Sequence, residues 1–295
     1  MNEMALASPD TDGIAAHRHQ TQAQPATPRL PEWLRVALAP LALVVAIFAP
    51  QALGLVPGLA AAVRGWPLAG QLAVGISLFA LTTVCAVLLV TALARFVDHS
   101  HLRDYGWRWD RRVIPSLTLG LGLAVAVALP VTGLAAIGGW LRPVDDASGG
   151  MPLWGVIVQA IALAFLLQAI PEELIFRGYL LRTLRSRGRI TPVWMSAILF
   201  AALHLLSSSG QEGLAERFLY LALPFGFAVL AGALRLVTGS IWAAIGVHGG
   251  IHVASLIAAV LGWGDGPVVW AVTGTLLTVI GATLLSRWRR CARAL

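Results

Sequence analysis

Long apolar runs separated by short polar segments dominate this sequence. A helix needs about 20 apolar residues to cross the ~30 Å hydrocarbon core of a bilayer. The fifth run is short, which suits a helix packed inside a bundle, and the fourth is expected to continue as a helix to about Leu184. The predicted fold class is therefore an all-α, polytopic membrane bundle of about eight transmembrane helices, at residues 34–56, 68–94, 114–140, 153–176, 192–206, 218–237, 240–262 and 267–286.

The composition agrees with this pattern. Of 295 residues, 58% are apolar and 12% charged, and the mean hydropathy is +0.78. A disordered chain has the opposite balance, and the 2 Cys exclude a disulfide scaffold. We expect an integral, multi-pass protein of the lipid bilayer. In a bacterial cell this bilayer would be the plasma membrane.

The basic residues indicate how the chain is oriented. The net charge is +7, and all 21 basic residues are arginines placed between apolar runs, which is typical of topology-setting charges and not of a nucleic-acid groove. With eight spans and the amino terminus inside, only Arg64, Arg142 and Arg217 fall in outer segments. The positive-inside rule therefore predicts that both termini are cytosolic, and no nucleic-acid partner is expected.

Three regions follow from these patterns. Residues 1–32 are rich in Pro, Gln and Thr and are predicted to be a disordered cytosolic tail without a signal peptide. Residues 33–286 form the transmembrane domain, and residues 287–295 form a short basic cytosolic tail. The segment from Val97 to Val113, rich in aromatic and charged residues, is predicted to lie at the membrane interface.

A few ionisable residues lie inside the predicted spans. The acids are Glu172 and Glu173, and the imidazoles are His204, His248 and His252. At 1.5 Å of rise per residue, Glu172 lies ~15 Å from the cytosolic end of its helix, His204 and His252 ~18 Å, and His248 ~12 Å. Intramembrane charges are costly and mark function by default. Three helices with such groups at similar depth predict one shared site.

The spacing of the residues around the two acids predicts which of them pair and which is left free. Glu173 and Arg177 are four residues apart, with the acid first, so they are expected to pair. Glu172 points about 100° away and is left free for chemistry. Pro171 has no backbone N–H, so a kink is expected just before the acids, with Gln168 as one donor that could fill the gap.

The two histidines of the seventh span share one helix face. His248 and His252 are four residues apart. Gly246 and Gly250 lie on the opposite face, where small residues are expected to allow a neighbouring helix to approach closely.

The motifs resemble a known family. Glu172-Glu173-xxx-Arg177, Phe200-xxx-His204 and His248-xxx-His252 are similar to the three motifs of the CPBP intramembrane proteases, a group that includes the type II CAAX prenyl endopeptidases and Abi-type proteins. The resemblance covers about residues 150–260. It implies an eight-helix fold with a cavity open to the cytosol and a membrane-associated peptide or protein as substrate.

The resemblance also implies roles for these residues. Glu172 and His204 would activate a water, His248 and His252 would stabilise the oxyanion, and Glu173 and Arg177 would be supporting residues. Family members usually carry Asn or a similar small polar residue at the position of His252, and a neutral imidazole can donate a hydrogen bond as Asn does.

Two questions stay open at the level of sequence. Glu172, His204, His248 and His252 are also suitable zinc ligands, although HxxxH lacks the glutamate of the HExxH signature. Two other functions are alternatives to an endopeptidase. One is a catalytically inactive immunity or partner-binding protein of the same fold, and the other is a proton-coupled transporter, which the lack of an evident inverted repeat disfavours.

Overall fold

The computed structural model describes residues 27–56, 58–142, 150–207 and 210–291. Every regular element in these ranges is helical, which confirms the predicted all-α class. The α-helices are α1 (Glu32–Gln51), α2 (Leu59–Arg64), α3 (Leu68–Ala92), α4 (Val113–Ile137), α5 (Leu153–Ala162), α6 (Ile170–Glu173), α7 (Leu181–Thr183), α8 (Thr191–Leu203), α9 (Gly213–Tyr220), α10 (Ala222–Thr238), α11 (Ile241–Val260) and α12 (Pro267–Cys291).

Short segments of other helix types extend or join these elements. Three are π-helical, at Leu93–Val97, Leu163–Ala169 and Leu174–Leu180. Four are 3₁₀-helical, at Ala52–Leu55, Leu102–Tyr105, Leu184–Arg187 and His204–Leu206.

Within the described residues, 7 helical segments are long and apolar enough to cross a membrane. They correspond to seven of the eight predicted spans, and the remaining one corresponds to the shorter apolar helix Thr191–Leu206, the span expected to be short. The chain is therefore an integral, multi-pass membrane protein. The seven segments are Glu32–Leu55, Leu68–Val97, Val113–Ile137, Leu153–Arg187, Gly213–Thr238, Ile241–Val260 and Pro267–Cys291.

The predicted tails fall mostly outside the described residues. Of the amino-terminal tail, residues 1–26 lie outside them, and α1 begins at Glu32. At the other end α12 continues as a helix to Cys291, and residues 292–295 lie outside the described ranges.

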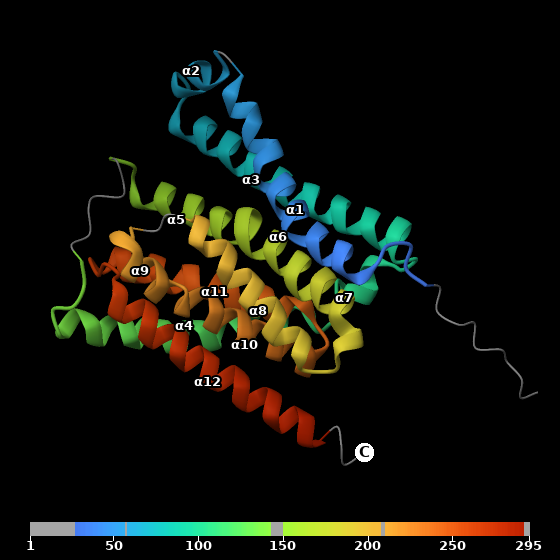
Figure 1. Cartoon of the computed structure of the whole chain (residues 1–295). Helices are drawn as coiled ribbons and strands as arrows, with labels where there is room; N and C mark the ends of the chain where they lie inside the picture. Colours follow the sequence, from blue (N-terminus) through green and yellow to red (C-terminus); the bar gives the residue numbers. More distant parts are fainter. Residues whose placement is uncertain (1–26, 57, 143–149, 208–209, 292–295) are drawn as a thin grey trace, which may run out of the picture.

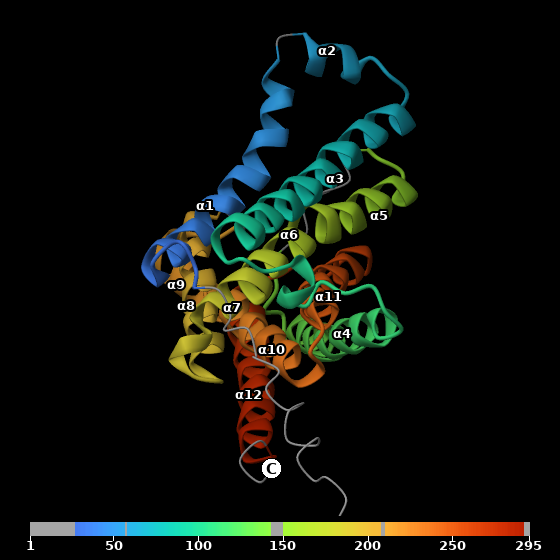
Figure 2. The ribbon, with the colours of Figure 1, turned by 90° about the vertical axis from the view of Figure 1, so that its right-hand side faces the viewer.

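Helix α11 lies in the interior of the bundle, beside α4, α10 and the long helix 153–187 (Figures 1 and 2). Most of its residues are buried. Its contact with α4 depends on glycine: a Cβ on Gly246 would overlap the carbonyl oxygen of Leu117, and one on Gly120 would overlap that of Ala243. The predicted close approach at Gly246 and Gly250 is confirmed, since Gly250 also faces α4. This packing fixes the position of His248 and His252 on the other face.

The segment between α3 and α4 covers the first turn of α11. The rings of Trp107 and Trp109 lie 5.0 and 4.6 Å from that of Trp242, whose indole N–H donates to the carbonyl of Arg108 at 2.9 Å. Burial raises the pKa of Tyr105, so its hydroxyl stays protonated and donates to Asp98 at 2.7 Å. Aromatic packing and a buried hydroxyl thus hold this segment against the helix ends.

The helix 153–187 changes its hydrogen-bond register on both sides of the acid pair. The N–H of Ile170 donates to Phe165, five residues back, so the helix is π-helical before Pro171. In that register the carbonyl of Leu166 would be paired with the N–H of residue 171, which proline lacks. The hydroxyl of Thr83, from α3, donates to this carbonyl at 2.5 Å. The gap expected before Pro171 is therefore filled by a donor from another helix, Thr83 of α3, in place of the side-chain amide of Gln168.

Candidate active site

The predicted site residues come from three separate helices. Glu172 and Glu173 end α6, and Arg177 follows in the π-helical turn 174–180. His204 follows the last residue of α8, and His248 and His252 lie on the buried α11. Glu173, Arg177 and His248 are 0–3% exposed and Glu172 is 8% exposed. So many ionisable side chains are seldom buried in an apolar bundle unless they bind one another or serve a function.

Glu173 links two of the sequence motifs. Its Oε1 accepts from Nη1 of Arg177 at 3.1 Å and lies 3.0 Å from Nδ1 of His248. The pairing of Glu173 with Arg177 predicted from their spacing is confirmed. A carboxylate opposite a guanidinium is ionised and can only accept hydrogen bonds. Nδ1 of His248 therefore carries the proton and donates the hydrogen bond to Glu173. This fixes the ring of His248 and leaves its Nε2 on the opposite side.

Glu172 lies on that opposite side. One of its carboxylate oxygens, Oε2, lies 4.0 Å from Nε2 of His248. Among the described residues, the ion pair of Arg177 is with Glu173, and Glu172 lies nearest to His248. The distance to His248 exceeds that of a direct hydrogen bond, and a single bridging water would fit the chemistry of a carboxylate and an imidazole nitrogen.

The end of α8 orients His204. The backbone N–H of His204 donates to Ala201, three residues back, and its ring Nδ1 lies 2.9 Å from the carbonyl oxygen of Phe200. A carbonyl only accepts, so Nδ1 carries the proton and Nε2 of the neutral ring has the free lone pair. The Phe200-xxx-His204 spacing therefore has a local cause: a helix end in which the side chain takes the place of a backbone donor.

His252 lies against His248. Their ring centroids are 5.3 Å apart and the rings are nearly parallel, at 23°. His252 is partly exposed, whereas His248 is buried. The predicted placement of both imidazoles on one face of α11 is confirmed.

Aromatic rings enclose the polar residues. The Phe200 ring lies 4.6 Å from that of His204 and 4.5 Å from the guanidinium of Arg177, a cation–π distance. Phe227 of α10 lies 4.7 Å from His248. Sequence reasoning missed Phe227, because an aromatic residue in an apolar span carries no signal that separates it from the core. These rings lower the local polarity and so strengthen electrostatic interactions within the site.

The described residues do not fit the alternative in which zinc is bound. In the part of the chain that the structure describes, no group of three or more His, Cys, Asp or Glu side chains is arranged to hold a metal ion. We therefore derive no step through a metal.

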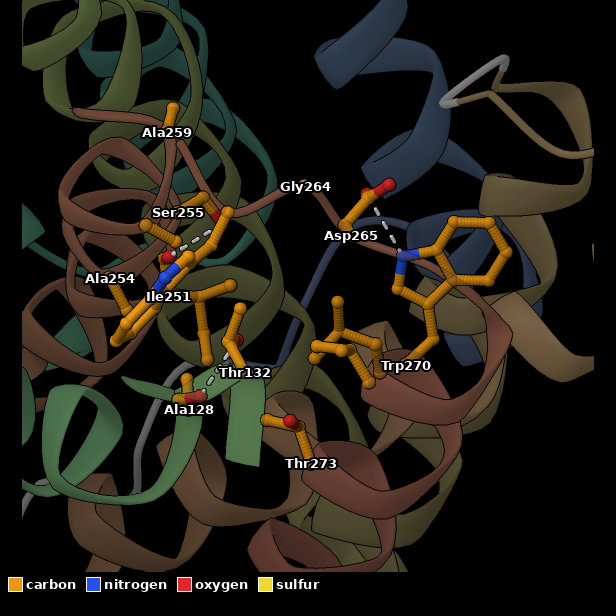
Figure 3. Close-up of a pocket in the computed structure, with 14 residues that line it drawn as sticks. Ala128, Thr132, Ile251, Ala254, Ser255, Ala259, Gly264, Asp265, Trp270 and Thr273 are labelled. Carbon is orange, nitrogen blue, oxygen red and sulfur yellow. Dashed lines mark hydrogen bonds between the residues drawn. The ribbon is translucent and has the colours of Figure 1, made fainter. Parts of the chain in front are cut away.

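A cavity of about 380 Å³ lies beyond His252, toward the end of α11 that is far from Ser240 (Figure 3). Its walls come from α4, α10, α11 and the start of α12. Ile251 and Ser255 contribute from α11, and the indole N–H of Trp270 donates to Asp265 at 3.1 Å on the opposite wall. The resemblance implies a cavity open to the cytosol, whereas the Arg distribution predicts that this end of α11 faces outward, so this cavity is not the one implied.

The fold and the buried residues define a class: a multi-pass, all-α membrane protein with a glutamate–histidine site inside the bundle. Comparison with protein families narrows the class. Residues 153–254 match the family described as "Rce1-like: Type II CAAX prenyl endopeptidase Rce1-like". This part of the chain, which contains every candidate site residue, is an Rce1-like domain of that peptidase family. The resemblance predicted from the motifs is confirmed. No curated protein matches the chain.

Proposed function

We propose that the chain is an intramembrane endopeptidase that hydrolyses a peptide bond of a membrane-associated protein or peptide. The observation that carries this proposal is the carboxylate of Glu173, which binds both Arg177 and His248 inside the bundle. It joins two motifs that are 75 residues apart and keeps one face of His248 toward Glu172. The match to a peptidase family supports the reaction class.

In the proposed mechanism, Glu172 and His204 remove a proton from a water molecule. The free Nε2 of His204 and the carboxylate of Glu172 are both acceptors, which suits a general base. The water oxygen forms a bond to the carbonyl carbon of the substrate, and the carbonyl oxygen takes the electron pair of the broken π bond. The carbonyl π bond then re-forms while the C–N bond breaks and its electron pair leaves with the nitrogen. The proton taken from water passes to this departing amine.

His248 and His252 are proposed to stabilise the oxyanion. With Nδ1 of His248 donating to Glu173, its Nε2 donates only after it has taken up a proton, so the oxyanion-stabilising form of His248 is the imidazolium. His252 would add a second donor beside it. Donors aimed at a developing oxyanion contribute roughly 3–4 kcal/mol each in known hydrolases.

Cleavage of a quenched, lipid-anchored peptide by the purified protein tests this proposal. The wild type is compared with Glu172→Gln and His204→Ala, each expected to lower the rate by at least about 100-fold. Glu212→Gln and His99→Ala change the same residue types at exposed positions and are expected to cleave at the wild-type rate. Equal rates in all five proteins would refute a role for Glu172 and His204.

A further inference from the structure

A second cavity, of about 320 Å³, lies on the opposite side of the candidate site from the one in Figure 3. It is formed where several helices end, by the last turns of helix 153–187, the start of α8, the end of α10 and the last turns of α12. We call it the arginine pocket. Its lining contains Arg177, Arg182, Arg185, Arg189 and Arg235, together with Gly178, Leu181, Gly188, Pro192, Leu236 and Trp288.

The lining of the arginine pocket carries only positive charge. It contains no Asp, Glu or other anionic group. Arg177 is balanced by Glu173, which lies in the candidate site. Arg235 lies near a second cation, Arg108, and its guanidinium is packed so tightly against Gly106 that a Cβ there would overlap it. The fold therefore places five arginines around one cavity whose lining contains no acidic side chain.

Two arginines of this pocket also have unused hydrogen-bond donors. Nη2 of Arg177 and Nε of Arg235 are buried and have no hydrogen-bond partner among the described residues. Buried polar atoms are normally paired, and each unpaired one calls for an explanation such as a missing ion or ligand. Arginine presents several N–H groups in a fixed fork that matches the oxygens of a phosphate group. The observation thus points to an anion with several acceptor oxygens.

The position of the pocket indicates where such an anion would come from. Helices α7, α10 and α12 end around it, and α8 begins there, so the pocket lies at one end of the bundle. Trp288 of α12 forms an aromatic part of the lining. Tryptophan is a residue type that favours the headgroup zone of a bilayer. Basic pockets between transmembrane helices on the cytoplasmic side are suited to phosphate-bearing lipid headgroups.

We propose that the arginine pocket binds a phosphate group. The proposal does not depend on peptidase activity, because it rests on the charge and the unpaired donors of the pocket alone. The geometry is shared by an anionic lipid headgroup and by free phosphate, and the experiment below separates these two sources.

The test measures lipid retention and thermal unfolding. Purified, delipidated protein is mixed with detergent micelles that contain phosphatidylglycerol, with micelles that contain phosphatidylcholine, or with inorganic phosphate alone. Bound lipid is counted by native mass spectrometry, and unfolding is followed by tryptophan fluorescence. The variants are Arg235→Gln, which removes a partly buried charge, and Arg185→Gln, which lies at an exposed edge of the pocket and leaves the core untouched. Arg290→Gln, exposed and outside the pocket, is the matched control.

The expected result is retention of phosphatidylglycerol over phosphatidylcholine. The affinity should fall about tenfold in each pocket variant and stay unchanged in Arg290→Gln. A saturable rise in the unfolding midpoint with inorganic phosphate alone, lost in the same two variants, would support the phosphate site and identify the free ion as its source. Equal retention of both lipids with no effect of phosphate, or equal losses in the control, would overturn the proposal. Binding of a peptide through its free carboxylate, with neither lipid nor phosphate bound, would overturn it as well.

Discussion

Nδ1 of His248 donates a hydrogen bond to Oε1 of Glu173 across 3.0 Å, and both side chains are buried. The same oxygen accepts from Arg177, so a single carboxylate atom holds a cation and an imidazole in place. A hydrogen bond of this kind does for His248 what the orienting acid does for the histidine of a hydrolase triad: it fixes the tautomer and the direction of the free nitrogen.

The buried pair of Glu173 and Arg177 gives the first prediction. Arg177→Met or Glu173→Gln alone should destabilise the protein by about 3–5 kcal/mol, because each leaves one partner of a buried pair unmatched. The double variant should lose much less than the sum, since neither charge then remains uncompensated. Unfolding midpoints in one detergent measure this. Additive losses in the double variant would show that the two residues stabilise the fold independently.

A substitution at His204 can separate the structural role of its Nδ1 from the proposed catalytic role of its Nε2. His204→Asn retains an N–H close to the position of Nδ1, so the hydrogen bond to the carbonyl of Phe200 can still form, but Nε2 is lost. We expect a protein that unfolds near the wild-type temperature and cleaves at least about 100-fold more slowly. If His204→Asn cleaves at the wild-type rate, Nε2 takes no part in the reaction.

The parts of this architecture that depend on local spacing could be predicted from sequence. The spans follow from the length of apolar runs, and the pairs Glu173–Arg177 and His248–His252 follow from the helical repeat. The contact of Gly246 with α4 could be anticipated because a missing side chain on one face permits close packing.

Other features depend on which helices meet, and a single sequence does not carry that information. Thr83 looks like any polar residue in a span, yet it supplies the donor that Pro171 lacks. Gln168 is the donor expected from sequence and lies next to the gap along the chain, but the hydrogen bond to the carbonyl of Leu166 comes from Thr83. Arg235 is read from sequence only as a topology charge, and its place in a cluster of arginines becomes visible only in the folded chain.

His252 is the position at which the chain departs from the usual motif. If its role is to donate a hydrogen bond beside His248, His252→Asn should retain most of the cleavage rate, because the Asn amide also donates. His252→Ala should lower the rate by about 100-fold, the typical effect of losing one oxyanion donor. Equal rates in the Asn and Ala variants would indicate that the 5.3 Å stacking of the two rings is structural only.

The hydroxyl of Thr83 gives a prediction about the helix that carries the acids. Thr83→Val removes the donor to the carbonyl of Leu166 and should destabilise the protein by about 1–3 kcal/mol. Thr91→Val is the matched control on the same helix, because Thr91 donates to Val87 within its own helix, where the carbonyl is not left open by a proline. Thermal unfolding of the two variants measures the difference. A loss at Thr91 as large as that at Thr83 would show that the gap before Pro171 has no energetic consequence.

The two cysteines offer a direct test of the predicted orientation. Both are free thiols: Cys291 is exposed at the end of α12, whereas Cys85 is partly buried within α3. Because the arginine distribution predicts a cytosolic carboxyl terminus, a membrane-impermeant maleimide should label Cys291 in inverted vesicles and not in intact cells or spheroplasts. Cys291→Ser should abolish the labelling and thereby show that Cys85 does not contribute. Labelling of Cys291 from the outside of intact cells would show that the topology is opposite to the predicted one. A substrate and the phosphate of a lipid headgroup would then reach the two ends of the bundle from the opposite sides of the membrane.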